Sequence, residues 1–145
     1  MNIKKVSIRV YGIYFDENRG LFVTDELIDN KKITKFPGGG LELGESTIYA
    51  LKREWIEELN TDIEIIKHIH TTDFFQVSIF NPEVQVIGVY YQVKPISNLN
   101  INIKNNEFDF SENETQTFRF IKDFSDNNLS LPTDKKAVIE FINYL

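Results

Sequence analysis

Three glutamates stand at helical spacing in the middle of the sequence. Glu54 precedes Glu57 by three residues and Glu58 by four, and these intervals place the three side chains on one face of a helix. Exposed like charges at such spacings cost about 0.2–0.5 kcal/mol per pair. A divalent cation bound by the carboxylates would turn this repulsion into a net attraction. Mg²⁺ prefers oxygen ligands and commonly lies between carboxylates and substrate phosphates. The three glutamates are therefore candidates for a metal site, but a solvated acidic face is the favoured interpretation of the charges taken alone.

A glycine run precedes these glutamates. Residues 37–40 are a proline followed by three glycines, which permit positive φ and let the backbone approach a ligand closely. Ser46 or Thr47 can then cap the helix that follows. Glu42 and Glu45, between the glycines and the helix, can lean toward its acidic face.

A helix over residues 46–59 is expected to carry the three glutamates. Its apolar positions recur at spacings of three, four and four and should form one stripe that faces the core; they are Ile48, Leu51, Trp55 and Leu59. Arg53 lies away from this stripe. An ion pair with Glu57, four residues on, is the ordinary role for such an arginine.

The segment 36–61 resembles the Nudix box of the Nudix hydrolases. That pattern is Gly, five residues, Glu, seven residues, Arg-Glu, an apolar residue, any residue, Glu-Glu, any residue, Gly and an apolar residue. Its six principal positions are occupied at the correct spacings by Gly39, Glu45, Arg53, Glu54, Glu57 and Glu58. Asn60 replaces the final glycine, where asparagine is the next-best type for a left-handed residue. Trp55 and Thr61 replace Ile, Leu or Val, so the departures concern packing and not charged groups.

The resemblance implies a fold and an activity. The fold would be an α+β domain, an α/β/α sandwich with a mixed β-sheet between helices, formed by residues 1–145 as a single domain. The reaction would be hydrolysis of the diphosphate bond of a nucleoside diphosphate linked to another moiety, such as a nucleotide, a nucleotide sugar or an ADP-ribose-like group. Mg²⁺ or Mn²⁺ would neutralise phosphate charge and activate a water.

The resemblance also implies roles for single residues. Glu54, Glu57 and Glu58 would hold the metal, the Gly39 carbonyl would complete its coordination, and Arg53 would orient a catalytic glutamate.

The general base stays open between the box and a later loop. The family often supplies a further glutamate from a loop beyond the box, and three are available: Glu107, Glu112 and Glu114. Glu114 is the best anchored, since it lies just before a predicted strand at 117–121. Glu54 on the helix is the other candidate for the base. The ordinary explanation of the three loop glutamates is that they belong to a polar surface loop.

Mostly strands are expected around the box. Segments rich in Val, Ile, Tyr and Phe predict strands at 6–15, 21–25, 33–36, 63–72, 84–93 and 117–121. Residues 97–116 are polar and are expected to be mostly loop. Thr133 or Asp134 can cap a last helix. Many strands with one helix in the middle and one at the end favour an α+β or layered α/β domain.

Composition narrows the function classes. The chain has 145 residues, usual for one domain, and a net charge of −6, which argues against sequence-independent nucleic-acid binding. Cysteine is absent, which excludes disulfides and thiolate sites. No apolar run predicts a signal peptide or a membrane span. We therefore expect a cytoplasmic protein with a small-molecule nucleoside-diphosphate-type substrate, and a homodimer is an open alternative.

Other residues offer weaker signals. His68 and His70 alternate along a predicted strand and could bind a metal, although a strand histidine is more often structural. Some of the aromatic residues Phe74, Phe75, Phe80, Tyr90 and Tyr91 could stack on a base, although most should be core. Four basic residues could bind terminal phosphates, and the sequence singles out none of them: Lys4, Arg9, Lys52 and Lys104. A non-catalytic nucleotide or sugar sensor and a structural module are the rival functions, and the intact box argues against both.

Overall fold

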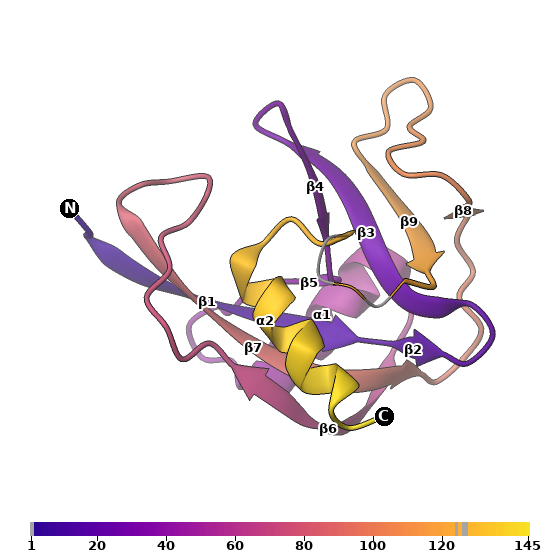
Figure 1. Cartoon of the computed structure of the whole chain (residues 1–145), viewed down its shortest axis with the longest axis horizontal. Coiled ribbons are helices and arrows are strands. Elements are labelled where there is room, and N and C mark those ends of the chain that lie inside the picture. The colour runs from indigo at the N-terminus through magenta and orange to yellow at the C-terminus, as the bar shows by residue number, and fades with distance from the viewer. Residues whose placement is uncertain (1, 124, 126–127) are drawn as a thin grey trace.

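The computed structural model describes residues 2–123, 125 and 128–145. Its elements follow in the order β1 (Lys5–Ile13), β2 (Phe15–Asp16), β3 (Gly20–Ile28), β4 (Lys31–Lys35), β5 (Gly38–Gly40), α1 (Thr47–Leu59), β6 (Ile63–Thr71), β7 (Val84–Pro95), β8 (Ile103–Lys104), β9 (Gln116–Ile121) and α2 (Pro132–Ile142). Figure 1 shows their arrangement.

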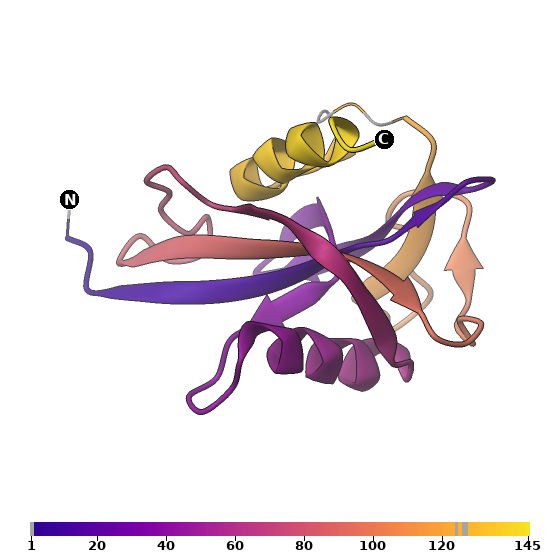
Figure 2. The same cartoon turned by 90° about the horizontal axis from the view of Figure 1, so that it is seen from below.

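A four-stranded mixed sheet forms the centre of the fold. Its order is β5-β1-β7-β6. Strands β1 and β7 are parallel, whereas β5 and β6 pair antiparallel with β1 and β7 respectively. Figure 2 shows α2 on one face of this sheet and α1 on the other. The predicted α+β fold with a mixed sheet between helices is therefore confirmed.

A second sheet continues from the first. Strand β3 pairs with β2, β4 and β9, and the two-residue β8 lies parallel to β9. The strand predicted at 6–15 is divided between the sheets, because β1 ends at Ile13 and β2 begins at Phe15. Apart from β8, the described residues of 97–115 contain no strand or helix, as the polar composition predicts.

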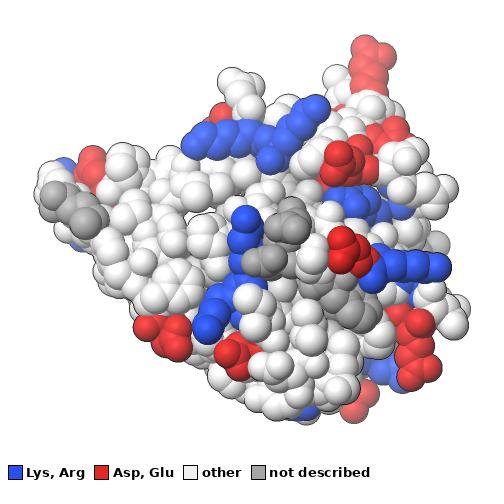
Figure 3. All heavy atoms as spheres, viewed as in Figure 1, with Lys and Arg blue, Asp and Glu red and all other residues white. Residues whose placement is uncertain are grey.

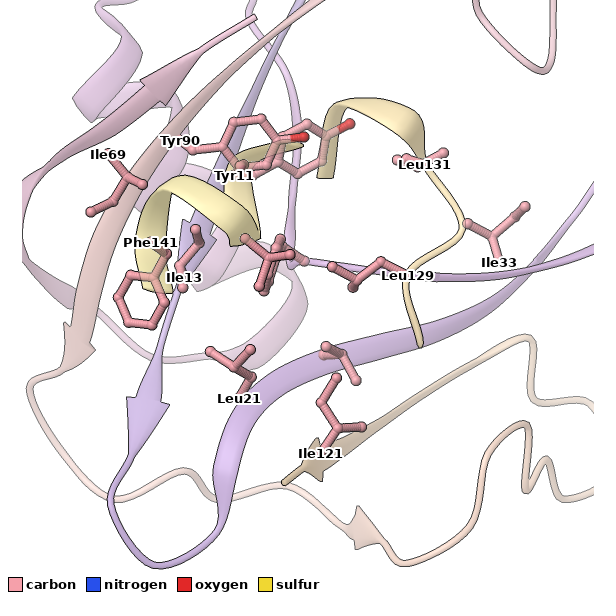
Figure 4. Packing of buried hydrophobic residues seen from close by; sticks show 14 residues of the cluster. Tyr11, Ile13, Leu21, Ile33, Ile69, Tyr90, Ile121, Leu129, Leu131 and Phe141 are labelled. Carbon is pink, nitrogen blue, oxygen red and sulfur yellow. The ribbon is translucent and has the colours of Figure 1, made fainter. Parts of the chain in front are cut away.

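Two apolar clusters fill the space on either side of the central sheet. One packs under α2, where Phe141 meets residues of β1, β3 and β7 (Figure 4), and Tyr11 and Tyr90 stack with ring centroids 5.0 Å apart. The other packs under α1 and includes the fully buried Trp55 and Phe22. The clusters fix both helices on the sheet, so the acidic face of α1 is held in place from within.

Helix α1 begins and ends as the sequence predicts. The Ser46 hydroxyl accepts a hydrogen bond from the Tyr49 N–H, and Asn60 adopts the left-handed conformation with φ 51°. The predicted apolar stripe is wrong at one position. Ile48 is 41% exposed, because the first turn is less covered than the later turns, and Ala50 takes an inward position instead.

Helix α2 begins differently from the prediction. Its N-cap is Leu131, with no side-chain capping bond, so the expected cap at Thr133 or Asp134 is wrong. Asp134 is instead fully buried in the first turn. Its carboxylate accepts hydrogen bonds from the Tyr90 hydroxyl and, at 3.0 Å, from the Phe36 N–H. No helix among the described residues is long and apolar enough to cross a membrane.

Candidate active site

The glycine run forms the short edge strand β5 against β1. Gly39 stands opposite Val10, and Gly40 opposite Arg9. A Cβ atom added to Gly39 would lie 2.4 Å from the Glu54 carboxylate carbon. Real Cβ atoms do not approach other atoms so closely, so Gly39 is required for Glu54 to lie against the strand.

Arg53 joins the glycine strand, the loop and the helix. Its Nε and Nη2 atoms donate to the Glu45 carboxylate at 2.5 and 2.8 Å. Nη2 also donates to the Gly40 carbonyl oxygen at 3.1 Å. Nη1 donates to Glu54 at 3.0 Å and to Glu57 at 3.3 Å. The hydrogen bonds that Arg53 donates to Glu45 are the main reason that the pKa of Arg53 is raised, so Arg53 is a fixed cation that orients three of the box glutamates.

Glu58 is half-buried on α1. Burial raises the pKa of Glu58 to about 7, and the Lys35 cation opposes that shift. The Oε2 atom of Glu58 is buried without a hydrogen-bond partner in the described part of the chain. An ionised carboxylate oxygen in such a place is costly unless a cation or a donor reaches it.

Three residues near Glu58 were not identified from the sequence, namely Glu26, Lys35 and Gln116. Glu26 and Glu54 raise the pKa of Glu58, whereas a hydrogen bond from Gln116 lowers it. Glu26 also forms a buried ion pair with Lys35, with Nζ and Oε2 3.1 Å apart. Strands β3, β4 and β9 bring these side chains to the helix, and no local pattern marks them.

The residues suit a divalent cation chemically. The donors are carboxylate oxygens, which Mg²⁺ and Mn²⁺ prefer, and one of them is a buried oxygen without a partner. As they stand, the described residues contain no cluster of three acids or histidines spaced to hold an ion. The hydrogen bonds from Arg53 to Glu54 and Glu57 hold those carboxylates toward the arginine. Small rotations of these side chains would be needed to converge on a cation.

Glu114 makes its hydrogen bonds within its own loop. Its carboxylate accepts hydrogen bonds from the backbone N–H and the hydroxyl of Ser111 at 2.8 and 2.6 Å, and Lys104 lies 4.0 Å away. The bonds from Ser111 lower the pKa of Glu114, which makes it a weaker base. Glu107 is 4.0 Å from Arg119 and largely exposed.

The polar contacts of His68 and His70 are with neighbouring residues of their own segment and not with the box. A β-bulge separates the pairing of His68 from that of His70. His68 is within hydrogen-bond distance of Thr71, and His70 is 3.9 Å from Asp73. No metal-binding group that includes them is present among the described residues.

A cavity of about 350 Å³ adjoins the site on the α2 side of the central sheet. Its walls come from β1, β7, the segment 76–81, the β3–β4 turn and the first turn of α2. Arg9, Tyr11 and Lys35 line it. Lys35 forms an ion pair with Glu26, and its charge lowers the pKa of Glu58. A charge that lines the cavity is therefore felt by a glutamate of the box.

Comparison with known proteins places this geometry in a family. The NUDIX domain model matches residues 5–130. Similar solved structures include the Escherichia coli ORF135 protein, at 15% identity and a TM-score of 0.70 over 96% of this chain and 90% of that one. MutT protein from Methanosarcina mazei has 16% identity and a TM-score of 0.70 over 97% and 96% of the two chains.

A further similar structure is an ADP-ribose pyrophosphatase from Streptococcus suis, at 16% identity and a TM-score of 0.54 over 94% of this chain and 87% of that one. No curated protein matches the chain. At these identities the structural likeness shows the fold, whereas the family model covers most of the chain. The chain therefore belongs to the NUDIX domain family, whose model matches residues 5–130.

Proposed function

We propose that the protein hydrolyses the diphosphate bond of a nucleoside diphosphate linked to another moiety, with Mg²⁺ or Mn²⁺ as cofactor. The observation that carries the proposal is the Arg53 cluster, which holds Glu45, Glu54 and Glu57 beside the glycine strand. Glu58 adds a buried oxygen without a partner among the described residues. Such an arrangement has no evident structural purpose, since it concentrates negative charge on one helix face.

Each residue has a place in the proposed mechanism. Glu54, Glu57 and Glu58, with the Gly39 carbonyl, would hold the cation. When bound, the cation neutralises phosphate charge and lowers the pKa of a coordinated water. Arg53 keeps the Glu54 carboxylate against Gly39 through the 3.0 Å bond from its Nη1.

One of two glutamates would accept the proton of the attacking water. Water attacks one phosphorus atom, the bond from that phosphorus to the bridging oxygen breaks, and a carboxylate accepts the water proton. Glu54 and Glu114 are the candidates. The bonds of Glu114 to Ser111 favour Glu54, and this choice departs from the family expectation of a loop glutamate.

A substrate panel tests the proposal. The full chain would be assayed for phosphate-bond hydrolysis with nucleoside triphosphates, dinucleotides, nucleotide sugars and ADP-ribose, in Mg²⁺, in Mn²⁺ and in EDTA. Glu57→Gln should lower kcat by several orders of magnitude and leave the melting temperature unchanged or higher, because it relieves like-charge repulsion. Glu83→Gln is the matched control, since Glu83 is half-exposed and pairs with Lys4 at 2.9 Å.

The outcomes separate the rival functions. Near-wild-type turnover in Glu57→Gln would remove the box glutamates from the mechanism. Nucleotide binding without turnover in either metal would favour a ligand sensor. The single-domain organisation, the cytoplasmic location and the open alternative of a homodimer stay predictions, and light scattering on the purified chain would test the last.

A further inference from the structure

Arg9 is a half-buried arginine without an acidic partner. The other three arginines each have a carboxylate oxygen nearby: Arg19 with Asp16 at 3.1 Å, Arg53 with Glu45 at 2.5 Å and Arg119 with Asp25 at 2.6 Å. Among the described residues, no carboxylate oxygen lies within 4.0 Å of the Arg9 guanidinium. The Nε atom of Arg9 donates a hydrogen bond to the Tyr11 hydroxyl at 3.3 Å. A guanidinium withdrawn from water without a counter-charge is costly, so an anion that reaches it is stabilised.

The position of Arg9 relates this unpaired charge to the active site. Arg9 pairs with Gly40 across the β1–β5 ladder, and a Cβ added to Gly40 would lie 3.4 Å from its Nη1 atom. A Cβ added to the preceding residue, Gly39, would lie 2.4 Å from the Glu54 carboxylate carbon. The guanidinium thus lies beside the strand that borders the box glutamates, close enough for their charge to act on it. Burial would lower the pKa of this arginine, but Tyr11, Glu54 and Glu26 together raise it.

The cavity that Arg9 lines is cationic in an acidic protein. Its charged lining residues are Lys5, Arg9, Lys35 and Asp29. Lys35 forms an ion pair with Glu26, 3.1 Å away. Arg9 has no such ion pair among the described residues. Figure 3 shows several basic side chains near the middle of the face that carries α2 and the β3–β4 turn, although the whole chain has a net charge of −6.

We propose that Arg9 binds a phosphate group of the substrate and thereby sets the orientation of the diphosphate between the box glutamates and the cavity. This inference rests on the proposed function and adds the residue that recognises the substrate on the side away from α1. A guanidinium presents a planar fork of donors that matches two phosphate oxygens. The remaining cavity, about 350 Å³ in total, lies within the usual size range of small-ligand pockets. It would receive the organic group attached to that phosphate.

Binding of a non-hydrolysable diphosphate tests this role without relying on turnover. The probe is methylenebisphosphonate, titrated calorimetrically into the full chain in Mg²⁺ and in EDTA. Arg9→Gln should weaken its binding about 10- to 100-fold, because hydrogen bonds to charged groups are lost. Arg9→Lys keeps the charge but loses the fork and should have an intermediate affinity. Lys136→Gln removes one positive charge from an exposed site on α2 and should bind like the wild type.

Steady-state kinetics provides the second readout. With any diphosphate that the enzyme hydrolyses, Arg9→Gln should raise KM by about the same factor and change kcat less, as expected when a ground-state contact is lost. An unchanged bisphosphonate affinity in Arg9→Gln, or no binding by the wild type, would overturn the assignment. If Arg9→Gln fails to fold, Arg9→Lys decides, and wild-type affinity and KM in that variant would count against the fork.

The two proposals fail separately. A wild-type chain that binds methylenebisphosphonate through Arg9 but hydrolyses no diphosphate would refute the proposed function and leave the anion site in place. If the chain hydrolyses diphosphates and the KM is the same in Arg9→Gln, the proposed function stands and the role of Arg9 is refuted.

Discussion

Replacing Gly39 with alanine should separate activity from stability. The added Cβ would lie 2.4 Å from the carboxylate carbon of Glu54, whereas carbon atoms in contact are about 3.5–4.0 Å apart. The Glu54 carboxylate must therefore move by more than about 1 Å. A displacement of that size at reacting groups can cost about 100-fold in rate, so kcat/KM should fall at least that far.

The stability of the same variant should change little. Moving Glu54 weakens its 3.0 Å ion pair with Arg53, but Arg53 keeps its hydrogen bonds to Glu45 and to the Gly40 carbonyl oxygen. The loss should therefore be that of a single hydrogen bond, about 1 kcal/mol. Replacing glycine with alanine offsets part of that loss by reducing the entropy of the unfolded chain by about 0.4–1 kcal/mol. The melting temperature should stay within about 4 °C of the wild-type value.

Gly44→Ala is the matched control for this prediction. Gly44 has φ +86°, and a Cβ added there meets nothing within 4 Å. A left-handed non-glycine residue costs about 1–2 kcal/mol, so this variant should melt earlier yet keep wild-type kcat/KM well below its melting temperature. The assays are differential scanning fluorimetry and initial rates on the best substrate of the panel. Activity of Gly39→Ala within about threefold of wild type would show that Glu54 does not act from its place against the strand.

Three further predictions concern the cation, the base and pH. Mg²⁺ or Mn²⁺ at about 100 times Kd should stabilise the fold by about 2.7 kcal/mol, and Glu57→Gln/Glu58→Gln should abolish the rise in melting temperature; an equal rise in that variant would place the ion elsewhere. Glu54→Gln should lower both kcat and the apparent Mg²⁺ affinity, whereas Glu114→Gln should have the wild-type kcat at every Mg²⁺ concentration. A kcat loss of about 10²–10⁴-fold in Glu114→Gln would instead identify the loop glutamate as the base. Burial raises the pKa of Asp134 from 3.8 to about 6, so the folded state binds the extra proton between these values and the free energy of unfolding should fall as pH rises through this window. Asp134→Asn should flatten that fall in urea titrations from about pH 4 to about pH 7, and an unchanged pH slope would show that Asp134 titrates normally.

Local features of the site were predictable because they depend on residues a few positions apart. The box spacing fixes which side chains share a face of α1, and Ser46 and Asn60 cap the helix as their types predict. The mixed sheet between helices also follows the resemblance. Ile48 shows the limit of periodicity, which identifies a face of a helix but not how far the neighbouring elements cover it.

Contacts between distant residues were not predictable from spacing. Asp134 looked like a helix cap, yet it bonds Phe36, which lies 98 positions earlier. The Glu26–Lys35 pair depends on the hairpin that places β4 beside β3. In each case a partner outside the motif decides what the polar side chain does.

The glycine strand is held at both ends by groups from opposite faces of the central sheet. Asp134 from α2 accepts from the Phe36 N–H at 3.0 Å, just before the glycines. Arg53 from α1 donates to the Gly40 carbonyl oxygen at 3.1 Å, at their end. Between them the Pro37 carbonyl accepts from the Gly12 N–H at 2.9 Å. A backbone fixed in this way need not reorganise when charge develops beside it, which is the condition for strong electrostatic stabilisation in an active site. If Glu54, Glu57 and Glu58 hold the proposed cation, their side chains are the parts of the site that must rotate to receive it. The cost of assembling the site would then fall on side-chain torsions and not on the fold.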